Sequence, residues 1–258
     1  MISIICVYNN ERTLREISLK SLKNQTVEFE LIKMDNTENK FKSAAEALNN
    51  EGKKAHSKYI MFLHQDVELG CKNWLEETEK ILDNISDLGI AGVAGAKEGQ
   101  IFGYIESAGA LWGKPIHNPI EIQTLDECLV IIPKSVFERL QFDEATFDGW
   151  HCYAADYALS VKKIGLNAYV IPAFIYHRTI STNIMSLGKY LRRLYFKHKL
   201  TFKHIYIAGD GSEISTIKLF FMYMSPIYIK LIPRRIRLYI SPLINKISRF
   251  VWWTPDLW

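Results

Sequence analysis

Residues 59–66 read YIMFLHQD, an apolar run followed directly by three polar residues. A short, unbroken apolar run is typical of a strand that is buried on both faces of a parallel sheet. The same pattern occurs upstream at 2–10 (ISIICVYNN) and, less purely, at 29–37 (FELIKMDNT). The sequence therefore predicts three strands of one sheet, each ending in polar side chains.

Helix signals separate these strands along the chain. Thr13 and Ser43 can each cap the N-terminus of a helix, and 74–85 reads as a third helix before a fourth apolar run at 90–94. This alternation predicts an α/β fold, with a mostly parallel sheet flanked by helices on both faces.

The second half of the chain is less regular. Glycines and Pro115 interrupt 95–119, so we expect loops and short strands there. Gly165 is a typical C-terminal stop for the helix that precedes it. The remaining pattern predicts strands at 129–132 and 168–171, and helices at 134–140, 152–164 and 186–198.

Composition limits the class of protein. The chain has 258 residues, of which 48% are hydrophobic and 23% charged, as in an ordinary globular domain. Its net charge of +4 is too small to argue for a nucleic-acid partner. The four cysteines lack C-x-x-C spacing, which favours reduced thiols. With no signal peptide and no apolar run of about 18–20 residues, we expect a cytoplasmic protein.

The end of the chain differs from the rest. We expect a globular domain at 1–208 and a basic, aromatic helical extension at 209–258. Basic and aromatic side chains without a long apolar span are typical of a segment that lies on a membrane surface, here the inner face of the cell membrane. Packing on the domain or formation of a homodimer accounts for the same pattern, and both alternatives stay open.

The polar residues that follow the strands are candidates for a ligand site. Ligands bind at the carboxyl ends of the strands in open parallel α/β sheets. Any one of these clusters can be a solvated turn, and for Asn9-Asn10 alone the turn is favoured. Three polar clusters at one edge nevertheless predict a site lined by 8–10, 35–37 and 64–66.

Several segments resemble the family 2 glycosyltransferases, whose fold is called GT-A. The stretch 4–9 (IICVYN) resembles the family's first strand, and 44–55 with 59–63 resembles its second helix and third strand. The segment from Phe142-Asp143-Glu144 to Gly165 resembles its acceptor side. More narrowly, His-Gln-Asp-Val and the run from Trp150 to Asp156 resemble the StrF-type domains of streptomycin biosynthesis. The resemblance covers about 1–200, which would make 1–208 the catalytic domain.

The resemblance implies a nucleotide-sugar donor with UDP or dTDP as its nucleotide. Asp35 would contact the nucleobase, since a carboxylate can accept the N3–H of uracil or thymine; the alternative is an Asx turn with Asn36. Basic residues after the last strand would steady the diphosphate, although a solvated helix face explains some of them. The residues expected to bind the donor are Val7, Tyr8, Asn9, Asp35, Asn36, His64, Gln65, Arg192 and Arg193.

The resemblance also implies a divalent cation, Mn²⁺ or Mg²⁺, that bridges the donor diphosphate. Family members usually carry Asp-x-Asp after the third strand; here His64 replaces the first acid and Asp66 matches the second. An imidazole favours Mn²⁺, whereas a hydrogen-bonding role for His64 stays an alternative. His177 matches a histidine that reaches the metal or the diphosphate, with simple packing as the alternative.

Asp156 matches the family's catalytic base, which takes the proton of the acceptor hydroxyl. The neighbouring acid of many relatives is Ala155 here, and a solvent-facing aspartate is the alternative. Trp150 and His151 can form a platform for the acceptor sugar, or can simply pack at a helix start.

The expected function is that of an inverting glycosyltransferase of the hexosyltransferase type. It would move a sugar to a hydroxyl of a glycan or lipid-linked acceptor in the synthesis of cell-surface polysaccharide or glycoconjugate. The departures at His64 and Ala155 keep one alternative open, a non-catalytic scaffold subunit with the same fold. A pyrophosphorylase-type enzyme would need a Gly-rich basic loop after the first strand, which Tyr8-Asn9-Asn10-Glu11 does not supply.

Overall fold

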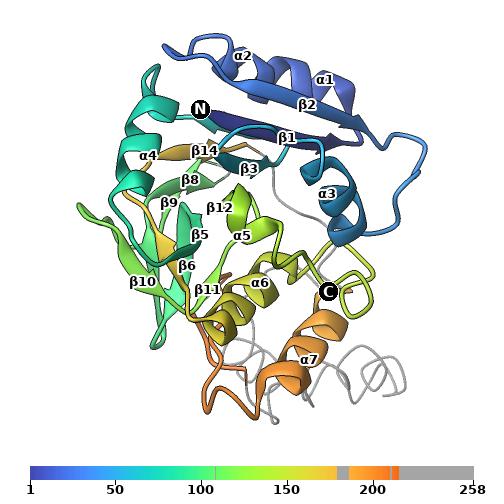
Figure 1. The fold of residues 1–258 in the computed structure, drawn as a ribbon, viewed down its shortest axis with the longest axis vertical. Coiled ribbons are helices and arrows are strands. Elements are labelled where there is room, and N and C mark those ends of the chain that lie inside the picture. The colour runs from blue at the N-terminus through green and yellow to red at the C-terminus, as the bar shows by residue number, and fades with distance from the viewer. Residues whose placement is uncertain (108, 179–185, 210, 215–258) are drawn as a thin grey trace, which may run out of the picture.

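The computed structural model describes residues 1–107, 109–178, 186–209 and 211–214. A seven-stranded sheet forms its centre, in the order β10-β13-β5-β12-β3-β1-β2 (Figure 1). From one edge to the other, the strands are β10 (Ile120–Ile122), β13 (Asn167–Val170), β5 (Leu88–Gly92), β12 (Leu129–Pro133), β3 (Tyr59–Leu63), β1 (Ile2–Tyr8) and β2 (Glu30–Asp35).

The α/β fold class is confirmed, but the sheet is mixed rather than mostly parallel. β1 runs parallel to β2 and β3, and β13 runs parallel to β5. β12 runs antiparallel to both of its neighbours, and β10 runs antiparallel to β13. The physical reason is the irregular region after β5, which brings the chain back into the sheet from the edge at which the parallel strands end.

Helices cover both faces of the sheet, as expected. α3 (Ala44–Gly52), α5 (Lys134–Phe137) and α6 (Tyr153–Val161) share one core with Ile5 and Phe62. α2 (Leu19–Leu22) and α4 (Trp74–Asp83) share the other core with residues such as Ile4 and Met61. Because side chains alternate along a strand, neighbouring residues of β1 and β3 feed opposite cores.

α7 (Leu187–His198) adds a third layer on the outside of α6 (Figure 1). Leu159 of α6 packs there against Leu191 and Leu194. Ile214 is 2% exposed and belongs to the same cluster. The folded part of the chain therefore continues past 208 at least to Ile214, and the expected extension at 215–258 lies outside the described residues.

The first helical region departs from its predicted form. It consists of α1 (Glu11–Thr13), a π-helical segment η1 (Leu14–Ser18) and α2. The expected cap at Thr13 is wrong, because the side chain of Asn10 accepts a hydrogen bond from the Thr13 N–H at 3.0 Å. By contrast, Ser43 caps α3 as expected, accepting from the Glu46 N–H at 3.2 Å.

Two small sheets fill the irregular region and the edge of the large sheet. One has the order β4-β14-β8-β9 and the other β11-β6-β7. The first places β14 beside β4, with His177 opposite Val67. The strands are β4 (Val67–Leu69), β6 (Ala94–Lys97), β7 (Gln100–Gly103), β8 (Ile105–Ser107), β9 (Ala110–Trp112), β11 (Thr124–Leu125) and β14 (Ile175–His177).

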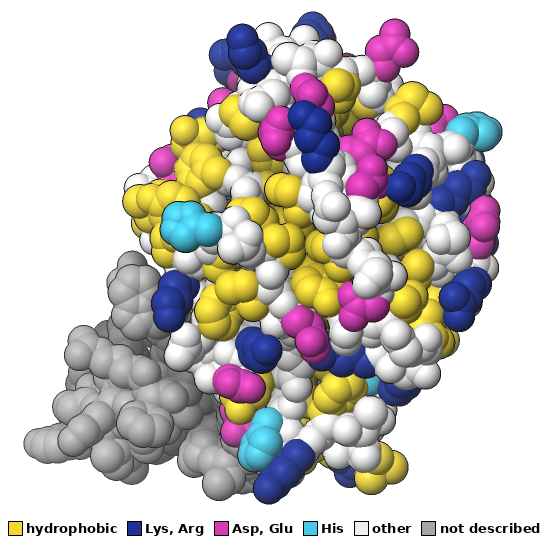
Figure 2. All heavy atoms as spheres, turned by 60° about the vertical axis from the view of Figure 1, so that its left-hand side comes forward, with side chains coloured by type: hydrophobic (Ala, Val, Ile, Leu, Met, Phe, Trp, Pro, Cys, Tyr) yellow, Lys and Arg dark blue, Asp and Glu magenta, His cyan; other side chains and the backbone are white. Residues whose placement is uncertain are grey.

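The surface and the thiols agree with the composition. Lys/Arg and Asp/Glu side chains are interspersed on the face that Figure 2 presents, with hydrophobic side chains between them. All four cysteines are free thiols, and three of them are buried. Among the helices of the described residues, none combines the length and the apolar character needed to cross a bilayer.

Candidate functional site

The ends of β1 and β2 meet at the expected edge of the sheet. Tyr8 stands opposite Asp35 in the parallel register, and the two side chains are hydrogen-bonded. The Asn36 N–H continues the pairing by donating to the Tyr8 carbonyl at 2.8 Å. Val7 is partly buried and packs on the core that contains α3. This edge therefore presents Tyr8 and Asp35 side by side.

Asp35 and Asn36 have different surroundings. Asp35 is exposed, and its carboxylate accepts from the Thr37 N–H at 2.8 Å and the Thr37 hydroxyl at 2.7 Å. These bonds lower the pKa of Asp35, and the bond from the backbone N–H of Thr37 has the larger effect. Asn36 is 3% exposed, and its amide exchanges two hydrogen bonds with the backbone of Phe41. Asn36 thus fixes the loop, and Asp35 faces solvent.

Gln65 joins the loop after β3 to the loop after β1. Its Oε1 accepts from the N–H groups of Asn9 at 3.1 Å and Asn10 at 3.0 Å. Its Nε2 donates to the Asn9 side chain at 2.7 Å. On the buried side, the Ser18 hydroxyl lies within hydrogen-bond distance of the His64 and Val67 carbonyls. The 64–67 turn is therefore held from two sides.

His64, Asp66 and His177 come together beyond the end of β3. One ligand atom from each lies within 4.8 Å of the others. His177 Nε2 is 3.4 Å from Asp66 Oδ2, and Asp66 is 8% exposed. β14 carries His177 to this place by pairing with β4. The structure thus brings together the two residues predicted as metal ligands, and His64 with them.

The pKa values of the two histidines in this cluster are shifted in opposite directions. Burial lowers the pKa of His64, and Asp66 acts in the opposite direction. For His177, burial also opposes the charged form, but the hydrogen bond to Asp66 and the charges of Asp66 and Asp126 raise its pKa. One carboxylate with two imidazoles is a donor set that suits a divalent transition-metal ion such as Mn²⁺. The residues present therefore fit the expected cation.

The orientation of His64 follows from its hydrogen bond to Tyr153. Its Nε2 lies 3.1 Å from the Tyr153 hydroxyl, which donates to the Glu127 carbonyl at 3.2 Å. Since that hydroxyl hydrogen is used, the Tyr153 oxygen accepts from His64 Nε2–H. The remaining nitrogen, Nδ1, then keeps its lone pair, which is the state in which a histidine can bind a metal ion.

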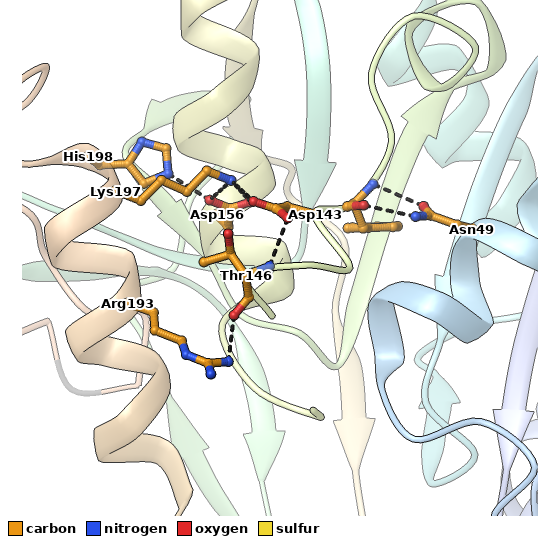
Figure 3. Close-up of polar contacts among 8 residues, drawn as sticks. Asn49, Asp143, Thr146, Asp156, Arg193, Lys197 and His198 are labelled. Atoms are coloured by element: carbon orange, nitrogen blue, oxygen red, sulfur yellow. Dashed lines mark hydrogen bonds and ion pairs between the residues drawn. The ribbon is translucent and has the colours of Figure 1, made fainter. Parts of the chain in front are cut away.

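Asp156 has surroundings that its sequence position did not suggest. It is 2% exposed, and its side chain points toward α7 (Figure 3). Lys197 Nζ donates to its carboxylate at 2.8 Å, and His198 Nε2 lies 2.7 Å from Oδ1. Lys197 also binds Asp143 at 2.7 Å. Asp156 therefore joins α6 to α7, and its role as a catalytic base stays a prediction that this geometry does not favour.

The predicted basic and aromatic residues lie on or near α7. Arg193 donates to the Thr146 carbonyl at 2.7 Å (Figure 3) and to Asp148 at 2.6 Å. It therefore fixes the 146–148 loop. The Arg192 guanidinium lies 5.7 Å from the centre of the Phe196 ring. Donor contacts of both arginines stay predictions.

The expected acceptor platform is only partly open to solvent. Trp150 is 43% exposed, while the His151 ring is partly buried and lies 6.0 Å from the ring of Tyr190. A charge on His151 lowers the pKa of His64. An acceptor contact by either residue stays a prediction.

The sequence did not single out Asp126 and Glu127, which lie close to the cluster. They precede β12, and the Cys128 carbonyl beside them accepts from the His64 N–H at 3.0 Å. The charge of Asp126 acts on both His64 and His177. A parallel strand would place residues that precede it at the far edge of the sheet. Only the antiparallel direction of β12 puts this pair at the site, and the apolar run at 129–132 carries no signal of direction.

Ligands of α/β sheets usually bind at the carboxyl ends of the parallel strands, and the oxygen and nitrogen donor set of His64, Asp66 and His177 lies at such an end here. Residues 3–183 match the model of the "Glycosyltransferase like family", and the chain belongs to this family. Comparison of the sequence with curated proteins gives no match.

Solved glycosyltransferases share the fold. A mannosyltransferase from Pyrobaculum calidifontis, in complex with GDP-Man and Mn²⁺, aligns with a TM-score of 0.57 and 12% identity over 78% of this chain and 64% of that one. GalNAc-T7 with UDP, GalNAc and Mn²⁺ aligns with a TM-score of 0.54 and 13% identity over 75% of this chain and 47% of that one. S. aureus TarS 1-349 with UDP-GlcNAc aligns with a TM-score of 0.52 and 15% identity over 77% of this chain and 66% of that one. This chain thus spans about half to two thirds of the length of each.

Proposed function

We propose that this chain is a metal-dependent, inverting glycosyltransferase of the hexosyltransferase type that uses a UDP- or dTDP-sugar. The observation that carries this proposal is the cluster of His64, Asp66 and His177 at the end of β3. It lies on the same edge as Tyr8 and Asp35, the residues that end β1 and β2. A diphosphate at the cluster would direct its nucleoside toward β2.

The donor set fits a cation with both nitrogen and oxygen ligands. Asp66 Oδ2, His177 Nε2 and His64 Nδ1 would hold it, and Mn²⁺ suits them better than Mg²⁺ does. When bound, the cation would offset the charge that develops on the leaving diphosphate. The complexes of two structurally similar transferases with Mn²⁺ support this choice.

On the donor side, the roles fall to residues at the ends of β1 and β2. The exposed Asp35 carboxylate is free to accept the N3–H of a uracil or thymine on its solvent side, while Asn36 holds the loop beneath it. Gln65 keeps Asn9 and Asn10 in place beside the cluster. A UDP-sugar and a GDP-sugar in similar folds support a nucleotide sugar in general.

The acceptor half of the proposal is a hydroxyl of a glycan or lipid-linked glycan, used in cell-surface polysaccharide or glycoconjugate synthesis. Trp150 is exposed near the start of α6 and can stack on a sugar ring. Placement of the enzyme on the cytoplasmic face of the membrane and membership of the StrF-type branch belong to the same proposal. The basic tail that would contact the membrane or a second copy lies outside the described residues.

The experiment that tests the function measures binding and turnover together. Titration calorimetry of UDP and dTDP, with and without Mn²⁺, followed by a screen of UDP- and dTDP-sugars for slow donor hydrolysis, should show metal-dependent binding and release of nucleotide. Asp66→Ala should abolish the metal dependence. Asp83→Ala is the matched control, because Asp83 binds Tyr59 at the opposite end of β3. Binding without hydrolysis or transfer to any acceptor would instead support the scaffold alternative.

A further inference from the structure

Glu127 is an acidic residue at the site that the expected mechanism does not use. It lies in the short link between β11 and β12, one residue before Cys128, whose carbonyl binds the His64 N–H. Its own carbonyl accepts from the Tyr153 hydroxyl, the group that orients His64. The backbone carbonyl of Glu127 is therefore linked to a proposed metal ligand through two hydrogen bonds.

The carboxylate of Glu127 is held at the N-terminus of α6. The backbone N–H groups of Cys152 and Tyr153 both donate to it. Two donors from one rigid helix end fix both the position and the direction of the group. The residue as a whole is partly buried.

The first turn of α6 contains a single acid, Asp156, and the carboxylate of that residue is already paired with basic side chains. Its carboxylate is shared with Lys197 and His198 of α7 and is 2% exposed. Ala154 and Ala155, which precede it, offer no proton acceptor. None of these residues of α6 is available as a base, whereas the carboxylate of Glu127, from the link before β12, reaches the same helix end.

The electrostatic surroundings of Glu127 are those of a proton acceptor. Burial and the neighbouring charge of Asp126 raise its pKa well above the usual range, while the two backbone donors act in the opposite direction. A carboxylate with a raised pKa takes a proton more readily near neutral pH than an ordinary one.

We infer that Glu127, rather than Asp156, is the general base of the reaction, a role that rests on the proposed function. The acceptor hydroxyl oxygen forms the bond to the anomeric carbon of the donor sugar. The bond between that carbon and the diphosphate oxygen breaks, and its electron pair leaves with the nucleoside diphosphate. The hydroxyl proton passes to the Glu127 carboxylate.

The test compares Glu127→Gln with Asp156→Asn and with the remote, exposed Glu138→Gln. The glutamine keeps an oxygen for the helix N–H groups but cannot take a proton. With a UDP- or dTDP-sugar and an acceptor that the wild type uses, Glu127→Gln should lower kcat by about 10²–10⁴-fold. Its Mn²⁺-dependent affinity for UDP or dTDP should stay within about threefold of wild type. Asp156→Asn and Glu138→Gln should retain kcat within about threefold per folded molecule.

Two results would overturn the inference, and they differ from each other. Near-wild-type kcat in Glu127→Gln, or a kcat loss confined to Asp156→Asn, would remove the role from Glu127 and leave the proposed function intact. A wild type that neither binds nor cleaves any UDP- or dTDP-sugar with Mn²⁺ would overturn the function and this role together. Thermal melts of each variant separate loss of chemistry from loss of fold, and Glu127→Asp, which retains an acid, should recover part of the lost kcat if Glu127 is the base.

Discussion

At the residue scale, the cluster of His64, Asp66 and His177 makes a direct prediction about metal binding. Asp66→Ala and His177→Ala each remove one proposed ligand, so the affinity for UDP in the presence of Mn²⁺ should fall by about tenfold or more. Calorimetry with and without Mn²⁺ measures it. Equal donor affinity in all samples, with or without the metal, would exclude a metal site here.

The raised pKa of His177 gives this cluster a pH dependence. Without metal, Asp66 favours protonated His177, so their contribution to stability is fully present below the usual pKa of 6.5 and is lost as pH rises through the raised value. In EDTA, the melting temperature of wild type should therefore exceed that of His177→Gln by a margin that shrinks from about pH 5.5 to about pH 8. Stabilisation by Mn²⁺ should grow over the same range, because metal ligands must be deprotonated. A margin independent of pH would contradict the pairing.

Tyr153 is a positioning residue for His64 and can be tested by removing one atom. Tyr153→Phe keeps the ring in the core but leaves His64 Nε2–H without its acceptor. Affinity for Mn²⁺ should fall by about 10–100-fold, the usual effect of losing such an outer partner. Direct titration of the metal measures it, and Tyr157→Phe, which loses a bond to the Leu140 carbonyl only, is the control. Equal Mn²⁺ affinity in both variants would contradict the orientation.

At the scale of elements, the pair α6 and α7 depends on the buried Asp156. Asp156→Asn would leave Lys197 and His198 facing a neutral amide in a site that is 3% exposed at the carboxylate. Breaking a buried ion pair from one side typically costs about 3–5 kcal/mol, and the remaining contact of Lys197 with Asp143 should keep the loss near the lower figure. Urea denaturation measures this loss in the free energy of unfolding. Unchanged stability would show that the contacts of Asp156 with Lys197 and His198 do not hold α6 and α7 together.

The same scale shows why the sequence predicted some elements well. The run 59–63 is apolar throughout and matches β3 residue for residue, because a strand buried on both faces must exclude polar groups. Ser43 and Gly165 mark helix ends through a side-chain oxygen and a left-handed backbone, here φ of +78° at Gly165. Local chemistry sets these features, so a local pattern can report them.

The missed features depend on contacts between distant residues. The hydroxyl of Ser18, at the end of the π-helical segment, bonds to carbonyls of the 64–67 turn. No local pattern in 14–18 indicates this contact. Glu127 belongs to the site only through the direction of β12. Asp156 was assigned from its position in a family pattern, whereas its partners lie on a helix more than forty residues later.

At the scale of the whole molecule, the basic tail makes a prediction about location. If residues beyond Ile214 lie on a membrane, full-length protein should float with anionic liposomes at low salt and detach at high salt, since each basic residue contributes roughly 1 kcal/mol. A chain truncated after Ile214 keeps the packed cluster of Ile205, Ile207 and Ile214 and should stay unbound. Should full-length protein also remain unbound, the tail is an oligomerisation or packing element and the lipid-linked acceptor loses its support.

The reversed direction of β12 also has a consequence for the order of folding. Most of the proposed donor side lies in the first 66 residues, but Glu127 reaches it only when Leu129 pairs with Leu63, across 66 positions of sequence, and His177 follows later still on β14. Closing so long a loop costs entropy before any contact repays it, so this pairing should form late. During synthesis, Tyr8, Asp35, His64 and Asp66 would be in place while Glu127 and His177 are still being made. Metal-dependent binding of a donor and its reaction would therefore both wait until β12 has joined the central sheet and β14 has paired with β4.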